Sequence, residues 1–143
     1  MRSPTSQLTW GLVLSGAGHL IHNLQEFGLG ILAGVETLLP ASITVLLIAV
    51  VRRRISRGVL LVAGTWALVV LVVGGGAVFP LAVLPFEPEQ SAAHYITHAV
   101  YALLQLPLLA ATTIAWAELR GHYHGRTDEL NRPEAPDDRR SPT

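Results

Sequence analysis

The chain of 143 residues contains no cysteine, no lysine and no methionine after Met1. Without cysteine it can form no disulfide, iron–sulfur cluster or thiolate zinc site. Any metal must therefore be bound by imidazole or carboxylate groups, which suit Zn, Fe, Mn or Cu(II) better than Cu(I). Arginine supplies every basic residue, and Ala, Gly, Val, Leu and Pro are abundant, which indicates a GC-rich bacterial source.

Charged residues are also scarce, at 14% of the chain, whereas 50% of the residues are hydrophobic. The apolar residues form long blocks instead of the amphipathic spacing of soluble helices, which predicts membrane spans. The formal net charge is zero. The glycines of Gly16-x-Gly18 are not a dinucleotide-binding fingerprint, because no predicted strand precedes them. We therefore expect membrane lipid around the chain and no nucleic-acid partner.

Four apolar segments follow a short polar N-terminus at residues 1–7. They cover residues 8–32, 37–54, 58–79 and 92–116. The second segment is short for a membrane core of ~30 Å, so the first arginines after it are expected to snorkel to the surface. Residues 119–143 are polar without apolar periodicity, which predicts a disordered cytoplasmic tail. The predicted fold class is all-α, with a four-transmembrane-helix bundle at residues 8–118 and a disordered C-terminal tail.

The first span carries polar residues that weaken it as a membrane helix. An ionised group near the bilayer centre costs about 2.5–3.5 kcal/mol on insertion scales, so neighbouring helices must cover these residues. The alternative is a signal peptide, with Arg2 in its n-region, Leu8–Leu14 as its h-region and cleavage near Ala17. Apolar residues resume directly after Ala17, which favours the membrane span.

Charges are distributed asymmetrically between the two sides of the predicted bundle. One side collects Arg2, the arginines at 52–57 and those after residue 119. The other side has Glu36 and the glutamates of the 87–90 loop, and no arginine. By the positive-inside rule both termini are cytoplasmic. We therefore expect a multi-pass protein of the bacterial inner (plasma) membrane.

A polar stripe runs along the first span. Its members, at spacing i, i+4, i+7 and i+11, are Ser15, His19, His22 and Glu26. At 100° per residue they lie on one narrow face of a helix, and this face must contact protein or water instead of lipid.

The fourth span carries a second polar stripe at the same spacing. Its members are His94, His98, Tyr101 and Gln105. Because the two spans cross the membrane in opposite directions, residues at equal depth should meet. The expected pairs are Glu26 with His94, His22 with His98, and His19 with Tyr101. Four histidines and one carboxylate are thus predicted to converge in the outer half of the bilayer.

This cluster has the composition of a metal site, because bundles build such sites from histidines and a carboxylate on facing helices. The predicted ligands of a Zn or Fe ion are His22, Glu26, His94 and His98. The residues expected to fix the imidazole tautomers from outside the ligand set are His19, Tyr101 and Gln105. With one position left for water, the metal could support hydrolysis or oxidation of a lipid-like substrate by a membrane enzyme.

Three other interpretations of the cluster stay open. The first is a non-enzymatic bundle in which polar side chains hydrogen-bond between helices, at about 0.6–2 kcal/mol each. The second is a b-type haem ligated by His22 and His98, although no arginine on the outer side is present for its propionates. The third is a proton-coupled transporter with a His/Glu relay, in which Gly74–Gly76 and Pro80 form a broken helix.

Residues 22–26 read His-Asn-Leu-Gln-Glu and resemble the His-x-x-Glu-Glu signature of a family of small, uncharacterised integral membrane proteins named for that motif. Gln25 departs from the first of the two glutamates. The segment His94-Tyr-Ile-Thr-His98 is similar to the Asn-x-x-x-His motif of the same family, with histidine in the first place. The resemblance implies a membrane protein in which His22, Glu26 and His98 are important, and it implies no particular reaction.

Overall fold

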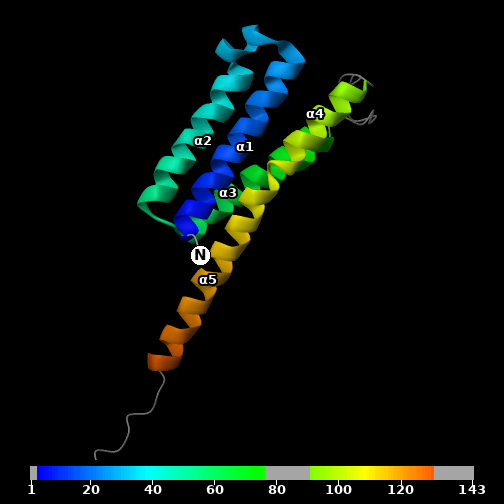
Figure 1. Cartoon of the computed structure of the whole chain (residues 1–143). Helices are drawn as coiled ribbons and strands as arrows, with labels where there is room; N and C mark the ends of the chain where they lie inside the picture. The colour runs from blue at the N-terminus through cyan, green and yellow to red at the C-terminus, as the bar shows by residue number, and fades with distance from the viewer. Residues whose placement is uncertain (1–2, 77–90, 131–143) are drawn as a thin grey trace, which may run out of the picture.

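The computed structural model describes residues 3–76 and 91–130, with side chains described as far as residue 121. Within these ranges the chain forms helices and no strand, which confirms the all-α prediction. The elements in chain order are α1 (Pro4–Phe27), a 3-10 turn η1 (Leu29–Ala33), α2 (Val35–Arg53), α3 (Arg57–Val69), a π-helical turn η2 (Val70–Gly74), α4 (Ala92–Leu103) and α5 (Leu106–Leu130) (Figure 1).

Three segments of the described chain are long and apolar enough to cross a membrane. They are Val35–Arg53, Arg57–Gly74 and Ala92–Gly121. Large hydrophobic side chains such as Leu46, Leu61 and Ile96 are exposed along them. Helices with apolar outer surfaces are the structure expected of a chain surrounded by lipid. The chain therefore has the architecture of a membrane protein.

Helix α1 packs against α2, α4 and α5. It begins at Pro4, because the Ser3 hydroxyl accepts a hydrogen bond from the Ser6 N–H at 3.3 Å and proline fits the first turn. It ends at Gly28, whose φ of 69° suits glycine. The predicted span at 8–32 is thus α1 followed by η1. The 24 residues of α1 extend over ~36 Å, which is long enough to cross a membrane, but α1 is not among the three segments that are also apolar enough to do so.

Glycines allow α1 to approach the chain between α4 and α5 closely. A Cβ atom on Gly11 would lie 2.7 Å from the Cα of Leu108, and one on Gly18 would lie 3.1 Å from the Cβ of Leu104. Within lipid, such close packing is a main source of helix association. The apolar core next to this crossing contains Leu8, Leu12, Leu47, Val51, Leu60, Ala63, Ala67, Leu108, Ala111 and Ala115.

The predicted fourth span, residues 92–116, is two helices with a break at residues 104–105. Pro107 has no N–H with which to continue the hydrogen bonding of α4. The N–H of Gln105 donates to the Ala102 carbonyl at 3.1 Å instead of to Tyr101. The side-chain amide of Gln105 therefore donates to the Tyr101 carbonyl, at 3.2 Å. The apolar pattern of residues 92–116 did not reveal this effect of Pro107.

Helix α5 continues to Leu130, past residue 119, where we expected the disordered tail to begin. Extending an existing helix needs no new nucleation, and no proline occurs between Pro107 and Pro133. The predicted tail beyond this point, residues 131–143, lies outside the described residues. The same holds for residues 77–90, which include Pro80 and the end of the predicted third span.

Helix α3 passes into the π-helical turn η2, which ends at Gly74. The ring of Tyr101 packs against Gly74 so closely that no side chain would fit there. Turns of this kind are frequent at functional sites, because they displace backbone groups from the regular helix pattern. Here the turn brings the Gly74 carbonyl to the histidines of α4.

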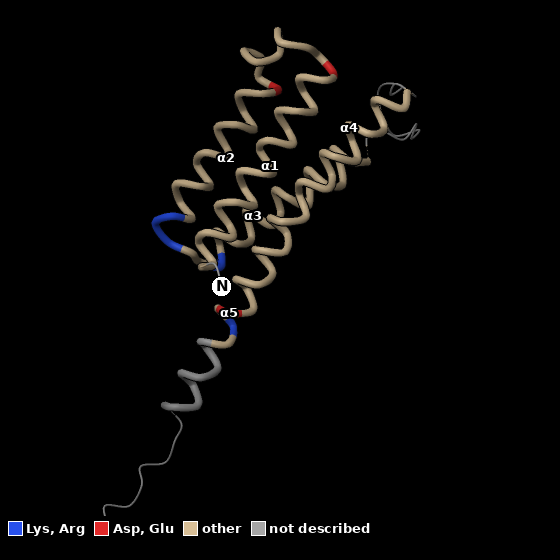
Figure 2. The backbone as a smooth tube through the Cα atoms, in the orientation of Figure 1, with Lys and Arg blue, Asp and Glu red and all other residues tan. Residues whose placement is uncertain are grey.

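Charged residues gather at two ends of the bundle (Figure 2). Arg52, Arg53, Arg54 and Arg57 lie at the turn between α2 and α3, at the same end as the start of α1. The glutamates at the turn between α1 and α2 lie at the opposite end. We call these the arginine end and the glutamate end.

Candidate metal centre

The two polar stripes meet between α1 and α4 in the predicted order of depth. The observed pairs are Glu26 Oε1 with His94 Nδ1 at 2.7 Å, His22 Nε2 with His98 Nε2 at 3.2 Å, and His19 Nδ1 with the Tyr101 hydroxyl. These contacts confirm that the antiparallel arrangement brings residues of equal depth together. The cluster lies in the half of the bundle nearer the glutamate end.

The deeper part of the cluster is fully hydrogen-bonded. The Ser15 hydroxyl donates to the Gln105 side-chain carbonyl at 2.6 Å. His19 accepts a hydrogen bond from the Tyr101 hydroxyl at Nδ1, and its Nε2 donates to the Glu36 carbonyl at 3.2 Å. Both imidazole nitrogens of His19 are thus occupied. These contacts are the interhelical hydrogen bonds that stabilise a membrane bundle.

Pro40 explains why the Glu36 carbonyl is available to α1. In a regular helix the N–H of residue 40 would donate to this carbonyl, and proline has no N–H. The Asn23 side-chain amide donates to it instead at 2.9 Å, and also lies 3.0 Å from the Thr37 hydroxyl. Because a carbonyl can only accept, this contact fixes which end of the Asn23 amide is nitrogen.

Asn23 in turn fixes the tautomer of His22. The Oδ1 atom of Asn23 lies 3.2 Å from His22 Nδ1, and an amide oxygen only accepts, so Nδ1 carries the proton. His22 Nε2 therefore has a lone pair and no hydrogen. The ring of Tyr101 stacks on the His22 imidazole with centroids 4.9 Å apart, which holds the imidazole in place.

Gly74 fixes the tautomer of His98 in the same way. The buried His98 donates from Nδ1 to the Gly74 carbonyl, so its Nε2 also has a lone pair and no hydrogen. The two Nε2 lone pairs therefore face each other across 3.2 Å. In a low-dielectric interior, two facing acceptors are unfavourable unless a proton or a metal cation lies between them.

The spacing of these nitrogens fits a metal ion. With metal–imidazole bonds of about 2.05 Å, nitrogens 3.2 Å apart subtend roughly 100° at the metal, near the tetrahedral angle. Axial imidazoles of a haem would lie about 4 Å apart on opposite sides of the porphyrin. The observed arrangement therefore disfavours the predicted haem alternative.

Glu26 adds a carboxylate to the two imidazoles. One ligand atom from each of His22, Glu26 and His98 lies within 4.8 Å of the other two, so this group could hold a metal ion. Three of the four predicted ligands form this group, and the fourth, His94, contacts two of them.

His94, which the sequence predicted as a fourth ligand, lies beside this group and is not part of it. Its Nδ1 donates to Glu26 Oε1, and its ring lies against His98 with centroids 4.4 Å apart. Its Nε2 is buried and has no hydrogen-bond partner within residues 3–76 and 91–121. An unpartnered buried nitrogen of this kind needs an explanation. In this arrangement His94 orients the carboxylate of Glu26.

Two residues that orient the imidazoles were not predicted. Asn23 follows His22 directly in the sequence. Its hydrogen-bond partner is the Glu36 carbonyl, which could be identified only by knowing that α2, with Pro40, packs against α1. The Gly74 carbonyl depends on the π-helical geometry of η2. In the sequence, Pro40 was the available signal, because a proline inside a helix always leaves one carbonyl without its usual donor.

Two imidazoles and one carboxylate form the ligand set of many catalytic zinc sites and of non-haem iron(II) oxygenases. Such sites keep a position open for water or substrate, and a metal ion held by these three protein ligands would keep one too. No protein-family model, no curated protein and no solved structure matches this chain, so the geometry described above is the basis for a functional assignment.

Proposed function

We propose that this chain is an intramembrane metalloprotein in which His22, His98 and Glu26 bind a Zn or Fe ion near the glutamate end of the bundle. The observation that carries the proposal is the approach of the two Nε2 atoms to 3.2 Å with both Nδ1 atoms already donating. Interhelical hydrogen bonding needs a donor opposite an acceptor. A metal ion accepts both lone pairs, and the Glu26 carboxylate offsets part of its charge.

The proposed activity is that of a membrane enzyme acting on a lipid-like substrate. A metal with an open position supplies an activated water or a centre for oxidation. His94 lies against His98 with an unpartnered Nε2, and its Nδ1 is held by the Glu26 carboxylate. A carboxylate that orients an imidazole in this way prepares the other nitrogen to accept a proton. His94 is thus the proposed proton acceptor.

The proposed topology has four membrane crossings with both termini in the cytoplasm of a bacterium. Helix α1 packs against three other helices, which cover its polar stripe. The separation of an arginine end from a glutamate end supports a cytoplasmic arginine end (Figure 2). The resemblance to the His-x-x-Glu-Glu membrane proteins points to the same residues, His22, Glu26 and His98.

Elemental analysis of the detergent-purified protein, without a histidine tag, tests the metal centre. We expect about one equivalent of Zn or Fe per chain after reconstitution, and loss of the ion in His22→Ala and His98→Ala. The matched control is His19→Gln, which removes an imidazole from the same face of α1 where both nitrogens are already hydrogen-bonded. This variant should keep the ion.

Wild-type protein that stays metal-free after reconstitution would contradict the proposal. It would leave the cluster as interhelical hydrogen bonding or as a proton path. Loss of the ion in His19→Gln as well as in the other two variants would also count against the assigned ligands.

A further inference from the structure

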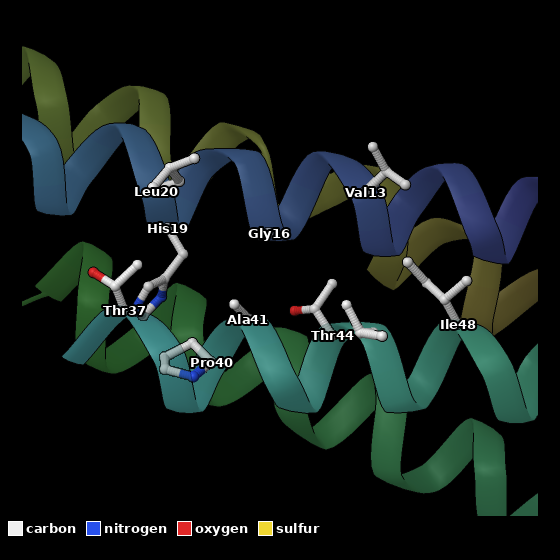
Figure 3. A pocket seen from close by; sticks show the side chains of 10 residues that line it. Val13, Gly16, His19, Leu20, Thr37, Pro40, Ala41, Thr44 and Ile48 are labelled. Atoms are coloured by element: carbon white, nitrogen blue, oxygen red, sulfur yellow. The ribbon is translucent and has the colours of Figure 1, made fainter. Parts of the chain in front are cut away.

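A groove between α1 and α2 extends along the two helices to His19 of the polar cluster (Figure 3). It has a volume of about 250 Å³. Its walls are mostly apolar and include Val13, Leu20, Ala41, Val45 and Ile48. Gly16 leaves a wall of the groove without a side chain. The groove therefore offers a long apolar surface within a segment that is able to cross the membrane.

One end of the groove is polar. His19 and Thr37 lie together at this end, near Leu20 and Pro40 (Figure 3). His19 is hydrogen-bonded to Tyr101, and the Tyr101 ring stacks on His22. The polar end of the groove is thus connected through two side chains to a proposed metal ligand.

The direction of the groove matches the orientation of a lipid in a bilayer. Thr37 lies at the start of α2, near the glutamate end, and Ile48 lies closer to the arginine end. At ~1.5 Å per residue, the part of α2 between them is ~16 Å long. A lipid with its head group at Thr37 would therefore extend its chain from the membrane surface toward the interior.

The charge at the polar end restricts the head group. Glu26 lies in the last turn of α1 and Glu36 in the first turn of α2, next to Thr37, and residues 3–51 and 58–119 contain no arginine or lysine. A phosphate or carboxylate head group would be repelled there and would find no cationic side chain to pair with. A hydroxyl or ester head group carries no charge and needs only hydrogen bonds.

We propose that the groove binds a single-chain lipid with an uncharged hydroxyl or ester head group, such as a fatty alcohol or a monoacylglycerol. Ligand sites for drug-sized molecules usually measure ~300–1,000 Å³, and a groove slightly smaller than this suits one acyl chain. As the substrate class of the metal centre, this inference rests on the proposed function. Binding of the lipid itself requires no metal.

Photolabelling tests the groove directly. The purified protein, in phosphatidylcholine vesicles, is exposed to a fatty alcohol with a diazirine in its chain, and the labelled residues are mapped by mass spectrometry. We expect saturable labelling of α1 and α2 along the groove, reduced by excess unlabelled fatty alcohol. Ala41→Phe fills the groove and should reduce this labelling about tenfold.

The matched control is Ala49→Phe, because Ala49 is exposed on the same helix and does not line the groove. It should leave the labelling unchanged. An alkyl phosphate probe of equal chain length should label the groove far less than the alcohol. Equal labelling by the phosphate, or labelling that Ala41→Phe leaves unchanged, would overturn the inference.

Metal content, measured in the same preparations, separates this inference from the proposed function. Groove labelling that Ala41→Phe removes while the metal is retained supports both. Groove labelling of a wild-type protein that binds no metal supports the lipid site and contradicts the metalloenzyme.

Discussion

The side-chain amide of Asn23 in α1 donates a 2.9 Å hydrogen bond to the backbone carbonyl of Glu36 in α2. This carbonyl lacks its usual helical donor because residue 40 is proline. Through this bond the start of α2 determines the orientation of the Asn23 amide and hence the tautomer of His22. A proline in one helix therefore helps to keep a nitrogen of another helix free of its proton, as the proposed metal centre requires.

Removing Asn23 should weaken metal binding without removing a ligand. Loss of a residue that orients a metal-binding histidine typically lowers affinity by about 10–100-fold, and we expect Asn23→Ala to fall in this range. Competition with a chromophoric chelator measures the affinity. Gln25→Ala, two positions away at an exposed site, is the control and should have no effect. Unchanged affinity in Asn23→Ala would show that His22 needs no partner.

The deeper hydrogen bonds should affect stability and leave metal binding intact. Ser15→Ala removes the donor to the fully buried Gln105, and we expect a loss of about 1–2 kcal/mol in the free energy of unfolding. Thermal unfolding in detergent measures this change. Ser42→Ala, which removes an exposed hydroxyl bonded within α2, should cost much less. Loss of metal in Ser15→Ala would contradict the division of the cluster into two parts.

Gly11 should be essential for the packing of α1 against α5. Gly11→Ala would place a methyl group 2.7 Å from the Leu108 Cα, a backbone atom that can move only with its helix. We expect destabilisation by about 1–3 kcal/mol, measured by thermal unfolding. Gly30→Ala is the control, because a Cβ atom there would meet nothing within 4 Å. Equal stability of the two variants would argue against this close crossing.

The absence of cysteine allows the topology to be tested with single introduced thiols. Gly30→Cys lies at the glutamate end, and Gly58→Cys lies at the arginine end and keeps all arginines. With a membrane-impermeant maleimide on intact cells, we expect labelling of Gly30→Cys alone, because the arginine end should be cytoplasmic. Gly58→Cys should react only after lysis. The reverse pattern would contradict the proposed orientation.

Periodicity predicted the helices and the pairs of the cluster, because residues at equal depth on two antiparallel helices must meet once both helices bury their polar faces. His22 with His98 and Glu26 with His94 follow from spacing alone. Spacing gives depth and does not specify which atoms are in contact, so it could not show that ligand atoms of His22, Glu26 and His98 gather within 4.8 Å of one another while His94 Nδ1 is occupied by the Glu26 carboxylate.

Features that depend on backbone irregularities were harder to predict. The roles of Asn23 and the Gly74 carbonyl require knowledge of which backbone groups are displaced and what lies opposite them. The break at residues 104–105 had a clear cause in Pro107, which the apolar pattern of the segment concealed.

X-ray absorption at the zinc edge of the reconstituted protein tests the central claim most directly. We expect two imidazole nitrogens and a carboxylate oxygen at about 2.0–2.2 Å from the metal. His98→Ala should lower the number of imidazoles by one, and His19→Gln should leave the spectrum unchanged. A coordination sphere of oxygen atoms alone, or a spectrum that His98→Ala does not change, would contradict a metal centre built on His22, His98 and Glu26.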